Sequence, residues 1–445
     1  MTRILGIELR RSNALTLAAL LIGVGGALLV LDGGTWRHDW LRFAYSTGSS
    51  LFLLLPLALA GGAVLGRREK RTRADELIAS TARPRAQRLT PALLAIGIAA
   101  AAAHLLLFAA GAILIAVSGS YLSAATLLWP LTGVLVLAGG TWLGLAAGRA
   151  WSSPLVPPLV AVLGLLLQFA FSELGPIGEP TRMENLSMLA QPPFQPWEAI
   201  SGRALAGYAL LGAGLLGAGF LLAAGRSWIP RVAAVAVLGL AGWAAMVVPG
   251  VGQADRYRVD AGAIRLVCAD GTPQVCVTAV HAWQLDKAAP QVREALQLLA
   301  KLPGAQTKAI EWHADRVYQP GDSGWDSTGL IRTPADTVSF DLNNNALVPN
   351  MLLGAGTGWN GCAEGPAHSV AGHAAGAWLM GTDVLTGVDD FGNYPEMEQQ
   401  IRDTVRGLRA LPEAEQVRRV TALRDAAQKC ENDLMPYLTT AKAAP

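Results

Sequence analysis

The amino-acid sequence predicts a membrane all-α helical bundle of six or seven transmembrane helices, followed by a soluble α+β domain. Of the 445 residues, 52% are hydrophobic and only 15% are charged, whereas about 25% of the residues in a typical soluble domain are charged. Residues 1–250 contain 18 basic and 10 acidic residues, and residues 251–445 contain 17 and 23. We therefore expect a transmembrane domain over residues 1–250 and an extracytoplasmic domain over residues 251–445. This composition excludes a wholly soluble enzyme and a nucleic-acid-binding protein that relies on a general positive field; we expect no nucleic acid among the partners.

Seven apolar runs approach the length of about twenty residues that a helix needs to cross a bilayer. They are Ala14–Leu31, Ser50–Leu65, Ala92–Val117, Leu127–Ala147, Leu155–Phe171, Leu205–Ala224 and Val232–Val248. Pro56 interrupts the second run, and Pro157 and Pro158 lie near the start of the fifth, so we expect kinks or close partner helices there. Small residues at 144–148 and 212–219 predict close helix packing.

Few polar side chains lie inside these runs, and none of them is a carboxylate. The clearest are His104, Thr141 and Gln168. Polar groups are costly in lipid and mark transport pathways where they cluster, so this scarcity disfavours a proton-coupled carrier. We expect His104 to form a hydrogen bond with a neighbouring helix.

The positions of the arginines predict the orientation in the membrane. Basic residues gather in the N-terminal stretch and in every second loop afterwards, above all in residues 66–90, which contain eight of them. Short loops rich in Lys and Arg stay in the cytoplasm. We therefore expect a multi-pass protein of the bacterial plasma membrane, with a cytoplasmic N-terminus and, after seven spans, an external C-terminal domain.

The cysteines agree with an external domain. All four, Cys268, Cys276, Cys362 and Cys430, follow residue 250, and disulfides persist in oxidising compartments. Three pairings are possible. We favour Cys268–Cys276, because CADGTPQVC is typical of two strand ends around an Asp-Gly turn, which leaves Cys362 to pair with Cys430. Four free buried thiols are the alternative, and a CxxC metal motif is absent.

The segment GRREKRTRADELIASTARPRAQRLT, residues 66–90, lies between the second and third runs and combines basic residues with a short amphipathic piece. It resembles the loop between the second and third helices of type-2 ABC exporter permeases, in which a short coupling helix docks on the ATPase. The residues that match this loop are Arg67, Arg68, Arg73, Asp75, Glu76, Leu77, Ile78 and Pro84. The family's glycine is missing, and residues 72–74 stand in its place. The alternative is a basic loop that only fixes orientation and binds anionic lipid.

The resemblance implies that this chain is the permease subunit of an ABC-type exporter. No G-x-x-x-x-G-K-[ST] phosphate loop occurs in the sequence, so the chain cannot be the ATPase. The implied partners are an ATP-binding subunit, a second permease subunit, identical or different, and the lipid bilayer. We expect no enzymatic activity, no catalytic residue, no metal and no cofactor in this chain.

The pattern changes after Pro249. Residues 257–271 and 272–280 alternate as the strands of a hairpin, and residues 309–320 predict another strand. Residues 290–302, 369–381, 395–408 and 412–430 predict helices, and residues 340–350 a loop. These elements predict an α+β domain large enough for its own core.

A frame in this domain, V-A-G-H-A-A-G-A-W-L-M-G, resembles the zinc-binding helix V-A-H-E-L-A-H-Q-W-F-G of gluzincin metallopeptidases. Aligned on Val370 and Trp378, Gly372 and Gly376 occupy the two ligand positions, and His373 occupies that of the catalytic Glu. Every catalytic residue is therefore replaced. The alternative function is a membrane-anchored, catalytically dead metallopeptidase-like receptor or assembly protein, and an ordinary core helix is the simpler interpretation.

Overall fold

The structure is a computed structural model and describes residues 6, 8–9, 13–32, 34, 36–71, 84–173, 181–188, 195–225, 227–311, 336–342, 346–358, 366–388 and 395–440. The chain divides into two compact units, Met1–Asp260 and Ala261–Pro445. The predicted second domain starts at residue 251, but the second unit starts at Ala261. The reason is that β2 (Tyr257–Val259) pairs antiparallel with β1 (Glu198–Ile200) inside the first unit.

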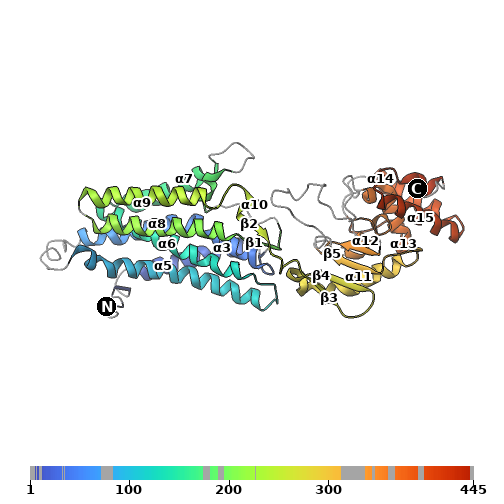
Figure 1. Ribbon diagram of the computed structural model, residues 1–445, viewed down its shortest axis with the longest axis horizontal. Coiled ribbons are helices and arrows are strands. Elements are labelled where there is room, and N and C mark those ends of the chain that lie inside the picture. Colours follow the sequence, from blue (N-terminus) through green and yellow to red (C-terminus); the bar gives the residue numbers. More distant parts are fainter. Residues whose placement is uncertain are drawn as a thin grey trace. The chain divides into compact units, whose positions relative to one another are not determined.

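Long helices build the first unit and lie side by side (Figure 1). The described residues form seven of them. They are α2 (Ala14–Leu31), α3 (Trp40–Arg71), α5 (Arg85–Ala116), α6 (Ala124–Ala150), α7 (Val156–Glu173), α8 (Gly202–Ala224) and α9 (Trp228–Val247). Each is long and apolar enough to cross a membrane. The predicted bundle of apolar helices is confirmed, with seven candidate spans.

The prolines of the apolar runs are accommodated in two ways. Pro56 lies inside the continuous helix α3. Pro157 and Pro158 lie in the first turn of α7, where the missing N–H would have no partner within the helix anyway. The fifth run therefore begins its helix at the prolines.

Glycines allow α3 and α6 to approach until their backbones touch. A Cβ on Gly144 or Gly148 of α6 would overlap the carbonyl oxygens of Leu59 and Ala63 of α3. A Cβ on Gly62 would in turn overlap the Thr141 carbonyl of α6. The predicted role of the small residues at 144–148 is confirmed, and α3 and α6 form the centre of the bundle.

The three polar side chains that the sequence analysis singled out behave differently from one another. Gln168 of α7 donates from Nε2 to the Phe52 carbonyl of α3 at 2.9 Å. Thr141 donates to the Ala138 carbonyl of its own helix at 2.8 Å. His104 lies against Gly133 of α6, but its buried Nε2 has no hydrogen-bond partner within the described part of the chain. The predicted interhelical bond of His104 is therefore wrong.

A buried ion pair joins two connecting segments near the C-terminal end of α9. The Nη2 of Arg256 lies 3.2 Å from Glu184 of η1 (Arg182–Leu186), and its Nε donates to Asn185 at 2.9 Å. Asn185 donates to the Gly250 carbonyl at 2.9 Å. Arg256 is only 2% exposed, so this cluster joins two connecting segments that are about 70 residues apart in sequence.

The second unit contains a four-stranded sheet in the order β3 (Leu266–Ala269), β4 (Gln274–Thr278), β5 (Lys308–Glu311) and β6 (Thr337–Phe340). The pair β3–β4 is antiparallel, and β4, β5 and β6 are parallel. The predicted long strand over residues 257–271 is wrong, because its first part belongs to β2 and only its end forms β3. The predicted strand over residues 309–320 contributes β5, and its remainder lies outside the described residues.

Helices pack on this sheet and on one another around a separate apolar core. They are α11 (Leu285–Leu299), α12 (Leu347–Leu352), α13 (Val370–Met380), α14 (Pro395–Arg409), α15 (Glu413–Gln428) and α16 (Met435–Thr439). The helices predicted over residues 369–381, 395–408 and 412–430 are confirmed. Helix α11 starts earlier than predicted, with Pro290 inside it, and α12 occupies the end of the predicted loop at residues 340–350.

Cys268 and Cys276 form a disulfide and lie directly opposite each other in the β3–β4 register. This confirms the favoured pairing. Cys430 is also disulfide-bonded, and its predicted partner Cys362 lies outside the described residues.

Candidate functional site

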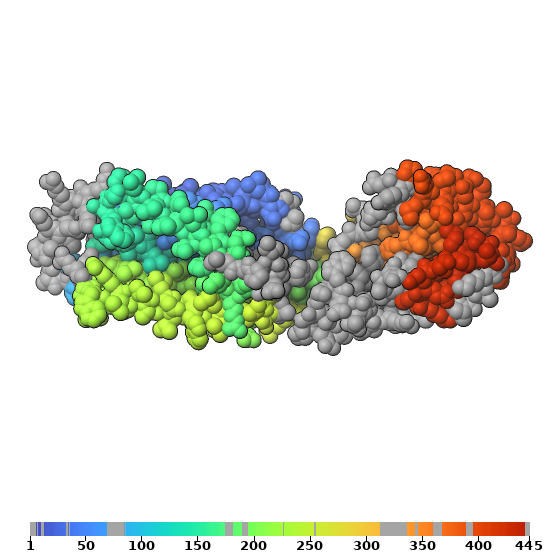
Figure 2. All heavy atoms as spheres, turned by 90° about the horizontal axis from the view of Figure 1, so that it is seen from above, coloured from blue at the N-terminus to red at the C-terminus, as the bar shows by residue number. Residues whose placement is uncertain are grey.

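The first unit contains a large groove with a volume of about 1350 Å³. Helices α7 and α9 border it, and α3, α6 and α8 supply residues from its floor. Figure 2 looks onto the face where the blue-green spheres of α7 and the yellow-green spheres of α9 lie. Pockets for drug-sized ligands measure roughly 300–1,000 Å³, so the groove can hold a larger molecule.

Apart from three arginines and Gln168, the described residues that line the groove are apolar or glycine. Helix α7 contributes Leu163 and Leu167, and α9 contributes Leu238. Gly164 and Gly242 also line it, and a Cβ on Gly242 would meet nothing within 4 Å. The contributions of α3 (residues 55–66), α6 (140–150) and α9 (231–242) extend over 11 or 12 residues, which corresponds to about 16 Å of helix at 1.5 Å per residue.

Three arginines line the groove at one end: Arg88 of α5, Arg149 of α6 and Arg231 of α9. Arg88 and Arg231 lie in the first turns of their helices, and Arg149 lies in the last turn of its helix. Since α5 and α9 run opposite to α6 in an up-and-down bundle, these three turns meet at the same end. It is the end that the sequence predicts to be cytoplasmic.

The other end of the groove is lined by α7 and the segment around η1. The Oε1 of Gln168 accepts a hydrogen bond from the backbone N–H of Met188 at 3.4 Å, while Gln168 Nε2 is bound to α3. Helix η1 contacts both α7 and α9, and Leu186 and Met188 line this end. One end of the groove is thus lined by Gln168 and apolar residues, and the other end is basic.

The charged residues that line the groove are all basic. Among its described lining residues, three are arginines and none is Asp or Glu. The groove therefore combines a basic end with walls built mainly from apolar residues and glycine.

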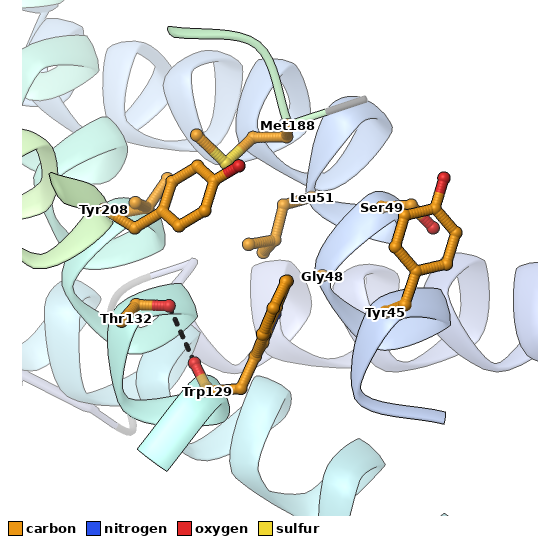
Figure 3. A pocket seen from close by; sticks show the side chains of 9 residues that line it. Tyr45, Gly48, Ser49, Leu51, Trp129, Thr132, Met188 and Tyr208 are labelled. Atoms are coloured by element: carbon orange, nitrogen blue, oxygen red, sulfur yellow. Dashed lines mark hydrogen bonds between the residues drawn. The ribbon is translucent and has the colours of Figure 1, made fainter. Parts of the chain in front are cut away.

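A second, far smaller pocket lies among α3, α6 and α8 (Figure 3). Tyr45, Trp129 and Tyr208 surround it, and Thr132 donates to the Trp129 carbonyl at 2.7 Å. Its volume is about 10 Å³, roughly the space of one water molecule. It cannot admit a substrate.

Few of the predicted coupling residues lie in the described part of the chain. Arg67 and Arg68 form part of the last turns of α3, and Arg67 Nε donates to the Ser152 carbonyl at 3.1 Å. Pro84 immediately precedes α5. The remaining five residues, Arg73, Asp75, Glu76, Leu77 and Ile78, lie outside the described residues.

The helix that resembles a zinc-binding helix is α13. A Cβ on Gly372 would overlap the Ala367 carbonyl, and one on Gly376 would lie 2.9 Å from the Leu352 carbonyl. These two positions are therefore filled by backbone, with no room for a ligand side chain. His373 Nδ1 donates to the Ser369 carbonyl at 3.0 Å, and burial lowers the pKa of His373. Within the described ranges, no three His, Cys, Asp or Glu side chains come close enough to hold a metal.

The sequence analysis missed a buried polar cluster at the carboxyl ends of β4 and β5. Glu311, 2% exposed, accepts hydrogen bonds at Oε2 from the backbone N–H and the hydroxyl of Thr278, both at 2.7 Å. His281 Nδ1 donates to the Oε1 of Glu311. Burial raises the pKa of Glu311, but the hydrogen bonds from His281 and Thr278 outweigh it, and the net pKa lies below its ordinary value.

Comparison with protein-family models, with curated proteins and with solved structures finds no match to this chain.

Proposed function

We propose that this chain is the permease subunit of an ABC-type exporter, which moves its substrate across the bacterial plasma membrane with ATP hydrolysed by a separate subunit. The observation that carries the proposal is the basic segment 66–90, which resembles the coupling loop of type-2 ABC exporter permeases. Seven helices able to span a membrane and a large groove among them support it.

The helices next to this segment support a docking role. Helices α3 and α5 each have 32 residues, or about 48 Å of helix, whereas the hydrocarbon core is about 30 Å thick. Both helices are therefore longer than the hydrocarbon core is thick. The C-terminal end of α3 and the N-terminal end of α5 both have basic residues. The segment between them is thus suited to lie beyond the lipid, where a cytoplasmic partner can reach it.

The same two helices link the segment to the groove. Gly66 of α3 and Arg88 of α5 both line the basic end of the groove, and α3 is packed backbone to backbone on α6. In the proposed mechanism, ATP binding in the partner displaces the segment. The α3–α6 pair follows it, and the basic end of the groove changes shape.

The finer topology belongs to this proposal. The N-terminus and the basic end of the groove would lie in the cytoplasm, because the arginine-rich loops lie there. The second unit would lie outside the cell, where its disulfides are stable. A second permease subunit would complete the transporter.

The test is a charge reversal in the segment. Glu76→Arg keeps the positive-inside bias, and a surface substitution changes the stability of the protein by about 0.5 kcal/mol. A like-charge contact at a docking surface costs several kcal/mol. We therefore expect normal insertion together with the loss of a co-purifying ATPase and of its stimulated turnover. Glu173→Arg is the matched control, because it also reverses an exposed negative charge but lies at the C-terminal end of α7, away from segment 66–90. It should leave ATPase co-purification and ATPase turnover unchanged.

Two outcomes would contradict the proposal. An ATPase that copurifies equally with both variants would reduce segment 66–90 to an orientation signal. If no ATPase copurifies with the wild-type protein, the chain is a receptor or assembly protein whose helices only anchor it.

A further inference from the structure

The groove and the small pocket of Figure 3 follow one another along the helices of the first unit. On three helices, the described lining passes from the pocket to the groove within about one turn. The pairs, with the pocket residue first, are Leu51 and Leu55 on α3, Val136 and Gly140 on α6, and Tyr208 and Leu211 on α8. Residues three or four positions apart lie one above the other on a helix, at a spacing of about 5 Å along its axis. The pocket therefore lies about one helical turn beyond the groove.

Met188 lies at the step between the two cavities. Of their described lining residues, it is the one that both cavities share. Met188 is only 6% exposed and belongs to the same apolar core cluster as Leu51, Val136 and Tyr208, which line the pocket. Its side chain thus fills the space through which the groove would continue into the pocket.

Hydrogen bonds hold the segment that carries Met188 from two sides. The backbone N–H of Met188 donates to Gln168 of α7 at 3.4 Å, and Gln168 donates in turn to the Phe52 carbonyl of α3 at 2.9 Å. Three residues earlier, Asn185 accepts a hydrogen bond from Arg256 at 2.9 Å. These bonds fix the path of the backbone, while the unbranched side chain of methionine has three rotatable bonds and adapts to its surroundings.

The Tyr208 hydroxyl lies at the same place. Its oxygen is buried and has no hydrogen-bond partner in the part of the chain that the structure describes. Figure 3 shows the hydroxyl end of Tyr208 and the side chain of Met188 on the same side of the pocket. A buried polar group without a partner is costly, so a polar group that enters past Met188 can gain a hydrogen bond to Tyr208. The arrangement with Met188 in place therefore contains an unfavourable group that opening relieves.

We propose that Met188 is a movable plug between the groove and the pocket, and that the two cavities form one path along the bundle when its side chain moves away. The inference deepens the proposed function, because the role of Met188 as a gate for a transported substrate rests on it. The separation of the two cavities by Met188 does not depend on a partner subunit and is tested by itself.

The test measures how fast a cysteine in the pocket reacts with methyl methanethiosulfonate, a small uncharged thiol reagent, in the full-length protein in detergent. Thr132→Cys places the thiol in the pocket, where Thr132 is only 7% exposed. Met188→Ala should raise its reaction rate by about tenfold or more, because the packing lost when a buried methionine is truncated corresponds to at least this factor. Leu186→Ala is the matched control, since Leu186 lines the groove but not the pocket, and it should leave the rate unchanged.

A second cysteine distinguishes an opened pocket from a loosened bundle. Thr47, 2% exposed, is not among the described lining residues of either cavity. Its hydroxyl donates to a carbonyl of its own helix at 2.8 Å, as that of Thr132 does at 2.7 Å, so the two substitutions by cysteine are equivalent. Thr47→Cys should react slowly in the wild-type background and in both truncated proteins.

Gln168→Met provides an independent variant in which the plug itself is intact. It keeps the approximate size of the side chain at position 168 but removes the bond to the backbone of Met188. It should also raise the reaction rate of Thr132→Cys and leave that of Thr47→Cys unchanged.

The outcomes separate the alternatives. An unchanged rate of Thr132→Cys with Met188→Ala and with Gln168→Met, or an equal increase with Leu186→Ala, would overturn the proposal. A parallel increase at Thr47→Cys would reduce Met188 to a packing residue and would also overturn it. The assay contains no ATPase, so an opened pocket without a co-purifying ATPase would reject the permease and keep the plug. Unchanged rates together with a co-purifying ATPase would reject the plug and keep the permease.

Discussion

The buried cluster around Glu311 gives the most direct energetic prediction, because one carboxylate receives three hydrogen bonds in a site closed to water. Glu311→Gln keeps the size of the side chain and one oxygen for the two Thr278 donors, but replaces the anionic acceptor of His281 by an amide. A hydrogen bond to a charged group contributes about 1.5–3 kcal/mol. We therefore expect Glu311→Gln to lower the free energy of unfolding of the second unit by about 2 kcal/mol at pH 7. Glu311→Ala leaves all three donors without their acceptor and should cost about 4 kcal/mol.

The pH dependence of this loss follows from the direction of the Glu311 pKa. Hydrogen bonds hold the folded-state pKa below its ordinary value of 4.5, so the folded protein binds the proton less readily than the unfolded chain does. The stability that the carboxylate contributes is thus complete above pH 4.5 and is lost as the pH falls through the lower, folded-state pKa. The difference between the wild type and Glu311→Gln should shrink over this acidic range.

The measurement is urea unfolding of the full-length protein in detergent between pH 7 and pH 3. Hydrogen exchange of the β4 and β5 amides reports the unfolding of the second unit. Asp336→Asn is the control, because this carboxylate also has a lowered pKa but is exposed, next to Lys308. It should change nothing measurable, since exposed pairs contribute little. Equal stability of the wild type and Glu311→Gln at pH 7, or a difference that persists unchanged to pH 3, would refute the reasoning.

Three further predictions concern the first unit and the topology. Gly144→Ala should destabilise the bundle by about 1–3 kcal/mol by overpacking and lower its thermal midpoint in detergent. The control Gly239→Ala lies in open space and should leave the midpoint unchanged. Equal midpoints of the two variants would contradict the close contact at Gly144. Arg256→Met should break the buried ion pair at a cost of about 3–5 kcal/mol and speed proteolysis at residues 181–188, and unchanged proteolysis would reject its joining role. A membrane-impermeant thiol reagent on intact cells should label Lys287→Cys but not Ser153→Cys, both exposed positions, and the reverse pattern would invert the topology.

The sequence could predict the elements whose signal is local. A membrane helix is recognised from about twenty consecutive apolar residues, and all seven runs became helices long enough to span. The Cys268–Cys276 hairpin was predictable for the same reason, since its two strands and its turn lie within a few residues. The role of Gly144 followed from residue size alone.

The groove needed information that the sequence does not carry locally. Arg88, Arg149 and Arg231 lie on three different helices, and the alternation of basic loops could have placed them at one end of the bundle. Nothing in the sequence, however, states that α7 packs on α3 and α9 on α8 with space between them. That space depends on which helices become neighbours, and this is settled by close contacts such as those of the glycines of α6.

The polar cluster of the second unit was missed for a related reason. Thr278 and Glu311 are 33 residues apart, and the parallel pairing of β4 with β5 brings their strand ends together. A charged residue at the end of an apolar strand was the available signal, because such a residue must find partners when it is buried. Parallel order cannot be read from strand patterns alone, so the partner could not be named.

The distribution of burial in the bundle indicates where movement costs least. Helix α6 is 61% buried over its apolar window and α3 is 56% buried, whereas α7 and α9 are 17% and 11% buried. Moving α6 against α3 would separate two backbones in contact, while moving α7 or α9 disturbs few buried groups, and local opening follows such low-burial elements. If a partner displaces the segment between α3 and α5, the α3–α6 pair should therefore move as one body, and the width of the groove should change at α7 and α9. The helices that border the groove are thus the part of the bundle that is easiest to move.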